Sequence, residues 1–138
     1  MSTRSYIGYL NDDGSVTGIY CHFDGYLEGV GRTLYNHYTT DEKVKALVAL
    51  GGISVLGERL EFKQDPKYSP KEYITPENGY TMAYARDWGE QLEIEHFSKP
   101  KQFEPDGMIE YSYLWVNNHW EVSFGHGFAP LIKEMFEG

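Results

Sequence analysis

Near its N-terminus the chain reads Ser5-Tyr-Ile-Gly-Tyr-Leu-Asn-Asp-Asp-Gly-Ser-Val-Thr-Gly-Ile-Tyr-Cys-His-Phe23. Residues 5–11 and 15–23 are rich in β-branched and aromatic side chains, and Asp12-Asp13-Gly14 lies between them. An Asp-Gly pair between two such runs is a strong signal for a β-hairpin, because both residues accept the backbone angles of a tight turn. We therefore expect two antiparallel strands, the second ended by Asp24-Gly25.

A helix is predicted directly after this hairpin, over residues 27–38. The apolar side chains that share one face at helical spacing are Leu27, Val30, Leu34 and Tyr38. Gly29 and Gly31 interrupt this face, and each weakens a helix by about 1 kcal/mol relative to alanine. Two glycines at such positions indicate that another part of the molecule packs closely against them.

A second helix follows after a very short turn. Thr39 and Glu42 have the spacing of a capping box, in which two side chains satisfy free backbone N–H groups at a helix start. Apolar residues within the segment form its buried face, and Gly51-Gly52 ends it in the usual C-terminal manner. Two consecutive helices are therefore expected between the hairpin and the rest of the chain.

The remaining chain is predicted to hold a long loop, a meander and a last helix. Three proline-containing pairs interrupt residues 53–79, which indicates a surface loop. Strands are expected at residues 80–86, 91–97, 109–116 and 119–124, with a helix at 129–137. Asn117-Asn118 is predicted to form a second tight turn, because asparagine tolerates positive φ. The order predicts one α+β domain over residues 1–138, with an antiparallel sheet of about five to six strands and helices on one face.

Composition excludes several classes of function. The 138 residues carry a net charge of −9, with five basic and seven acidic side chains in residues 1–60 against seven and fourteen in residues 61–138. Binding to duplex DNA or to an anionic membrane surface needs a basic footprint, which this chain lacks. The one cysteine excludes an internal disulfide, and no apolar run approaches the length of a membrane span, so we expect a cytoplasmic protein.

No catalytic or metal-binding motif stands out. Cys21 and His22 are neighbours on a strand and point to opposite faces, so they cannot form a dyad with each other. None of the five histidines has the i, i+4 partner of a helical zinc motif, and the glycine pairs do not match a phosphate-binding loop. We therefore expect no metal, no cofactor and no catalytic residue, although the question of enzymatic activity stays open.

Aromatic content is the most unusual feature of the composition, at 16%. The chain has twelve Tyr, three Trp and seven Phe residues, but its arginines are few and scattered. Tyrosine and tryptophan beside isolated arginines suit the stacking of bases with pairing of phosphates, or a protein interface. The third interpretation is that the aromatic residues simply belong to a tyrosine-rich sheet with one face partly exposed to water.

Several segments together resemble a family of short bacteriophage and prophage proteins of unassigned activity. The segments are Thr3-Arg4-Ser5-x-Ile7, Ile19-Tyr-Cys-His-Phe-Asp-Gly-Tyr26 and Lys43-Val44-x-x-Leu47-x-x-Leu50-Gly51. The similarity covers about the first 57 residues well and is looser beyond them. It implies a phage origin and a bacterial cytoplasm. Small accessory proteins of phages often counter host defence.

In that context we expect an anti-defence protein that sequesters a small nucleotide-type immune signal without cleaving it. A protein-binding inhibitor of a host defence or nucleic-acid enzyme is the alternative, and a small nucleotide hydrolase ranks third. A homo-oligomer is also expected, because it would bury exposed tyrosine-rich surface. The candidate ligand-binding residues are Arg4, His22, Asp24, Tyr26, Arg32, Arg86 and Trp88. The arginines would pair with phosphates, Tyr26 or Trp88 would stack on a base, and His22 and Asp24 would bind sugar or base edges.

Overall fold

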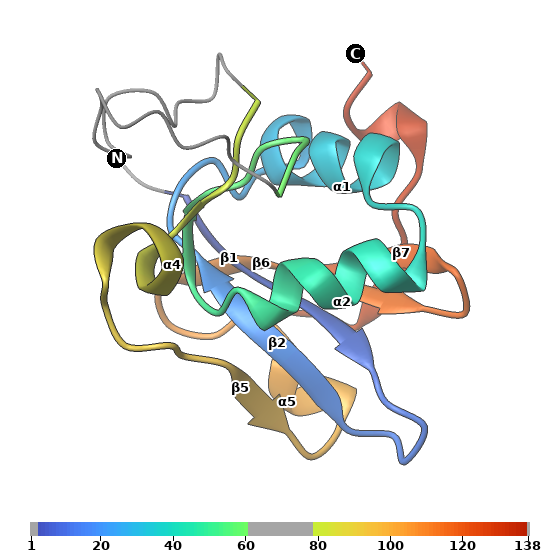
Figure 1. Ribbon diagram of the computed structural model, residues 1–138. Coiled ribbons are helices and arrows are strands. Elements are labelled where there is room, and N and C mark those ends of the chain that lie inside the picture. The colour runs from blue at the N-terminus through green and yellow to red at the C-terminus, as the bar shows by residue number, and fades with distance from the viewer. Residues whose placement is uncertain (1–2, 61–78, 138) are drawn as a thin grey trace.

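The computed structural model describes residues 3–60 and 79–137, which form an α+β fold around one mixed sheet (Figure 1). The strands are β1 (Arg4–Leu10), β2 (Val16–Cys21), β3 (Ile53–Val55), β4 (Met82–Ala83), β5 (Glu95–Phe97), β6 (Ile109–Val116), β7 (His119–Ser123) and β8 (Phe128–Pro130). They follow the order β4-β3-β2-β1-β6-β7-β8, and β5 pairs with β2 beside β3. The α+β class is confirmed, with more strands in the described residues than the five to six predicted.

The sheet is not purely antiparallel, which corrects the prediction. Both predicted hairpins form: β1 pairs antiparallel with β2, and β6 with β7. Asn117 and Asn118 take φ angles of 50° and 63° in the second turn, as the sequence predicts. However, β1 runs parallel to β6, and β2 runs parallel to β3. The long connections between these pairs carry helices, which gives the chain room to return in the same direction.

Helices cover one face of the sheet. They are η1 (Leu27–Gly31), which is a π-helical turn, α1 (Arg32–His37) and α2 (Asp41–Ala49). Their apolar side chains pack on a core that includes Ile7, Ile19 and Tyr113 from the sheet. Two tryptophan side chains tie the helices to the second hairpin, because Trp120 Nε1 donates to Tyr38 O at 2.8 Å and Trp115 Nε1 donates to Asp41 at 2.6 Å. No helix in the described ranges is both long and apolar enough to cross a membrane.

The opposite face of the sheet carries a smaller core built on two glycines. Gly8 and Gly18 lie directly opposite each other on β1 and β2. The ring of Phe103, from the short helix α5 (Pro100–Phe103), lies so close that a Cβ at Gly18 would be 2.7 Å from its Cε1. The two glycines therefore leave the space that this fully buried ring fills.

Three local predictions were wrong. Thr40, rather than Thr39, caps α2: its side chain accepts a hydrogen bond from Lys43 N at 3.2 Å. The strand expected at residues 80–86 stops after β4 and becomes the helix α4 (Tyr84–Trp88), which Gly89 ends with a φ of 69°. The helix expected at 129–137 is β8 followed by the 3-10 turn η3 (Lys133–Met135). Most of the loop expected at 53–79 lies outside the described residues, and β3 occupies its first part.

Candidate functional site

A polar groove of about 480 Å³ runs beside α1. One wall consists of the turn after β2, η1 and the exposed face of α1, and the other wall consists of residues 55–59 with Gly79. Ligand sites typically have volumes of roughly 300–1,000 Å³, so the groove is large enough for a small molecule.

The helical wall starts from a strained turn at Asp24. This residue has a φ of 57°, a left-handed conformation that non-glycine residues seldom adopt. Its carbonyl oxygen accepts a hydrogen bond from Val30 N at 2.8 Å. Gly29 packs directly on the same oxygen, where a Cβ would lie only 2.2 Å away. The close packing predicted around Gly29 is therefore present, and it fixes the position of Asp24.

Charge changes sign along this wall. Asp24 and Glu28 stand at the end next to β2, and Arg32 follows one turn later on α1. Asn36 and His37 complete the wall at the other end of α1. Residues four apart share a helix face, so Glu28, Arg32 and Asn36 form one row along the groove. The row presents acceptors at its first end and donors further along.

The opposite wall is held by a buried hydroxyl cluster. Tyr38 Oη donates to Gly57 O at 2.7 Å, and Gly57 N donates to Thr81 Oγ1 at 3.0 Å. Burial raises the pKa of Tyr38 to about 12, so the phenol stays a donor at neutral pH. The backbone of Arg59 is fixed by hydrogen bonds with Gly79 and Thr81 at 2.9 Å each. This wall therefore places the Arg59 side chain on a rigid backbone.

The guanidinium of Arg59 is an accessible positive charge of the groove. Its side chain is 58% exposed, and its Cζ lies 5.5 Å from the centroid of the Tyr80 ring. Glu58 lies 3.9 Å away, but this carboxylate also meets His37 Nε2 at 3.1 Å. An exposed pair at such a distance contributes little to stability, so Arg59 is available to a ligand.

Arg32 faces the same groove from α1 and is oriented by the C-terminal segment. Its Nη2 donates to the carbonyl oxygen of Phe136, and its Cζ lies 5.7 Å from the centroid of the Phe136 ring. The fork of a guanidinium has five N–H donors, so these contacts leave others for a ligand. The groove thus receives one arginine from each wall.

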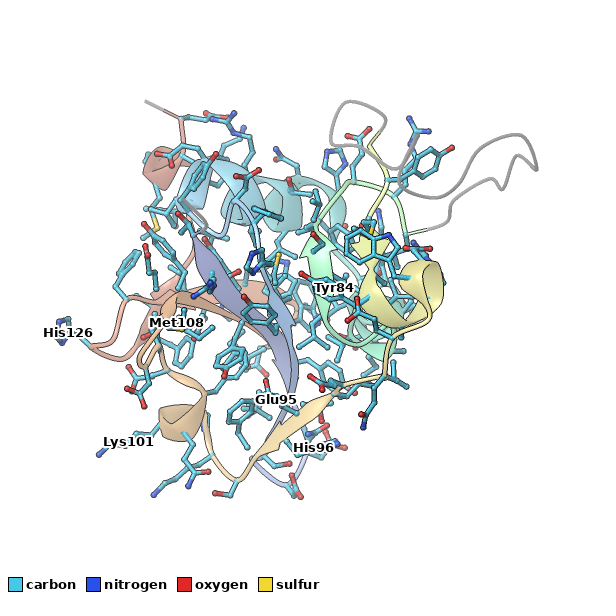
Figure 2. All side chains as sticks on the ribbon, turned by 90° about the vertical axis from the view of Figure 1, so that its left-hand side faces the viewer. Tyr84, Glu95, His96, Lys101, Met108 and His126 are labelled. Atoms are coloured by element: carbon cyan, nitrogen blue, oxygen red, sulfur yellow. The ribbon has the colours of Figure 1, made fainter. Side chains whose placement is uncertain are left out.

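Of the seven predicted ligand-binding residues, the groove brings together only Asp24 and Arg32. Arg4 and His22 lie elsewhere, both beside Tyr20: the Tyr20 hydroxyl lies 2.5 Å from His22 Nδ1, and Arg4 acts electrostatically on the Tyr20 hydroxyl. Figure 2 views the neighbouring edge of the sheet, where Tyr84 and Glu95 lie on α4 and β5. The groove therefore does not contain the predicted site as a whole.

Arg86, Trp88 and Tyr26 do not line the groove. The guanidinium of Arg86 is held by protein oxygens, with Nη2 at 2.7 Å from Thr81 O and Nε at 2.8 Å from an Asp87 carboxylate oxygen. The Trp88 ring packs on Tyr84. Of the tyrosines in the described ranges, Tyr26 is the most exposed, at 38%, and most of the others are half-buried, so the homo-oligomer stays a prediction.

Sequence reasoning missed the groove residues Phe23, Glu28, Asn36 and Arg59. Asn36 and Arg32 are four residues apart on a helix, which is a signal that the sequence offers. The placement of Arg59 depends on the contacts of Gly57 with Tyr38 and Thr81, and no local pattern predicts them.

Nucleophilic and metal chemistry have little basis in the described residues. Cys21 is fully buried, and burial raises the pKa of its thiol to about 12. A thiol with such a pKa is protonated at neutral pH and is a poor nucleophile. Within residues 3–60 and 79–137, no group of three His, Cys, Asp or Glu side chains has the arrangement to hold a metal ion.

No protein-family model, curated protein or solved structure matches this chain. The resemblance to phage proteins therefore stays a prediction. The geometry and charge of the groove beside α1, called the α1 groove below, are the features that bear on function.

Proposed function

We propose that this protein binds a small nucleotide-type ligand in the α1 groove and holds it without cleaving it. The observation that carries the proposal is that Arg32 and Arg59, from opposite walls, both line one cavity of about 480 Å³. Arginine is well suited to bind phosphate, because its planar fork donates two parallel hydrogen bonds to phosphate oxygens.

An aromatic side chain completes the set of groups that a nucleotide needs. Phe23 lines the groove and is 41% exposed, so part of its ring is open to a ligand. Its backbone is fixed by a hydrogen bond from Phe23 N to Ser54 O at 3.0 Å. Stacking of a base on an aromatic ring contributes about 1–3 kcal/mol to binding. A fixed, exposed ring beside two arginines favours a nucleotide over a simple anion.

Local backbone features support the same location. π-Helical turns occur frequently at functional sites, and η1 forms part of the groove wall. The left-handed Asp24 precedes it directly, and such strained residues cluster where ligands bind. In a phage-infected bacterium, tight retention of an intact nucleotide would withdraw an immune signal from its receptor, which is the biological role that we propose.

The test is a thermal-shift screen of the full chain against mononucleotides, cyclic di- and trinucleotides and ADP-ribose derivatives. A ligand that binds only the folded state raises its stability by about 2.7 kcal/mol at a hundredfold excess over Kd. The decisive variant is Arg59→Gln, because it removes the accessible charge and keeps the backbone contacts. Lys101→Gln is the matched control: it removes one positive charge on α5, at the end of the molecule away from α1 (Figures 1 and 2).

The expected result is a large rise in Tm with one class of nucleotide. This rise should be smaller in Arg59→Gln and unchanged in Lys101→Gln. Mass spectrometry should recover the ligand intact. Recovery of a cleaved product would make the protein a nucleotide hydrolase and would overturn the retention part of the proposal. No shift across the panel would overturn nucleotide binding altogether and would favour the alternative, a protein-binding inhibitor.

A further inference from the structure

The acidic end of the α1 groove has a chemistry that the arginines do not explain. Asp24 and Glu28 line it beside the exposed ring of Phe23. Carboxylates repel a phosphate, so this end does not suit the anionic part of a nucleotide. The groove therefore has a direction, with a base-binding end at Phe23 and a phosphate-binding end at Arg32 and Arg59, where the Glu58 carboxylate is paired with His37 at 3.1 Å.

The backbone of Asp24 is held in place, and its exposed carboxylate has no partner within the described residues. Its backbone is fixed by the hydrogen bond to Val30 N and by the close contact with Gly29. None of the hydrogen bonds and ion pairs found in residues 3–60 and 79–137 involves its side chain. A residue kept in a strained conformation with an unused, solvent-facing acceptor is poised to bind a donor.

An ionised carboxylate accepts hydrogen bonds and donates none. The Watson–Crick edge of guanine presents two adjacent donors, N1–H and the 2-amino group, at a spacing that matches two carboxylate oxygens. Adenine presents an unprotonated N1 acceptor at the corresponding position, which faces a carboxylate unfavourably. A side chain that pairs bidentately with a base edge discriminates against the wrong base by about five- to 150-fold.

We propose that the α1 groove selects a guanine base, with Asp24 accepting from N1–H and the 2-amino group while Phe23 stacks on the ring. This inference rests on the proposed function and names the class of nucleotide that the site takes. Glu28, one turn further along the wall, adds negative potential at the base end and leaves the bidentate contact to Asp24.

The experiment measures Kd for GMP, IMP and AMP by isothermal titration calorimetry with the full chain and with Asp24→Asn. Asparagine tolerates the left-handed conformation and has the same size, so the fold is retained while the carboxylate becomes an amide. Asp12→Asn is the matched control, because Asp12 lies in the β1–β2 turn and not in the α1 groove. Asp24→Gly is a second variant, since glycine takes positive φ freely.

We expect GMP to bind about tenfold or more tightly than IMP, which lacks the 2-amino donor, and than AMP. Asp24→Asn and Asp24→Gly should lose this preference, and Asp12→Asn should keep it. Equal binding of AMP and GMP by the wild type would overturn the guanine inference and leave nucleotide binding intact. A preference lost in Glu28→Gln but kept in Asp24→Asn would overturn the role of Asp24. Failure of all three nucleotides to bind would overturn the inference and count against the proposed function.

Discussion

Replacing Gly29 by alanine sets two effects of opposite sign against each other. Gly29 lies in η1, and alanine in a helix is favoured over glycine by about 1 kcal/mol, so helix propensity alone predicts stabilisation. The structure predicts the reverse, because the new Cβ would lie 2.2 Å from Asp24 O, well inside the 3.0 Å that real Cβ atoms respect. The obstacle is backbone, which cannot swing aside as a flexible side chain can.

The balance favours destabilisation. Overpacking of this kind costs about 1–3 kcal/mol. Moving the Asp24 carbonyl also weakens its hydrogen bond with Val30 N, which contributes about 1 kcal/mol. After the gain of about 1 kcal/mol in helix propensity is subtracted from these costs, the free energy of unfolding should fall by about 2 kcal/mol. For a domain of this size the corresponding drop in Tm is about 8 °C.

The assay is thermal unfolding followed by circular dichroism, with Gly31→Ala as comparator. A Cβ at Gly31 would lie 3.3 Å from Tyr113 Oη, so this variant should change Tm far less. Because the Asp24 carboxylate moves with its backbone, Gly29→Ala should also lose the preference for GMP. A Tm for Gly29→Ala equal to or above that of the wild type would refute the argument that Asp24 is locked by this contact.

Further predictions concern the two cores. Tyr113→Phe removes the hydroxyl that donates to Gly25 O at 2.7 Å, so urea unfolding should show a loss of about 1–3 kcal/mol; an unchanged midpoint would contradict this. Gly18→Ala places a Cβ against Phe103 and should destabilise by about 1–3 kcal/mol, with partial rescue by Phe103→Leu in the double variant. Burial raises the pKa of Cys21 from 9.0 to about 12, so the folded state favours the neutral thiol. The stability that this pKa difference contributes to the folded state is complete below pH 9 and is lost as the pH rises toward 12. In Cys21→Ala this pH dependence should vanish when the free energy of unfolding is measured across the same range.

The sequence predicted the elements that local signals encode. The turns at Asp13-Gly14 and Asn117-Asn118 specify their hairpins through backbone angles, and helical spacing identified the helical segments after the first hairpin. The parallel pairing of β1 with β6 was missed, because it joins segments far apart in the chain and leaves no local pattern. The helix α4 was missed although Gly89 ends it, because five residues are too few for a periodic signal.

The same division applies to the candidate site. Asp24 and Arg32 were predicted from their place after the first hairpin, and both line the groove. Arg59 was missed because its placement depends on the hydroxyl cluster around Tyr38, which forms only when distant segments pack. The guanidinium of Arg86 could in principle bind phosphate, but in the structure it donates hydrogen bonds to Thr81 O and other protein oxygens.

The position of β1 in the middle of the sheet has a consequence for how this protein is made. Its neighbour β6 does not begin until Ile109. At about 5–20 residues per second, a ribosome needs roughly 5–20 s to reach β6 after completing β1. During that time one edge of β1 has no strand to pair with, and unpaired strand edges promote association between chains. The growing polypeptide is therefore more prone to aggregate than the finished protein, and slower growth at low temperature with ample chaperone should raise the soluble yield.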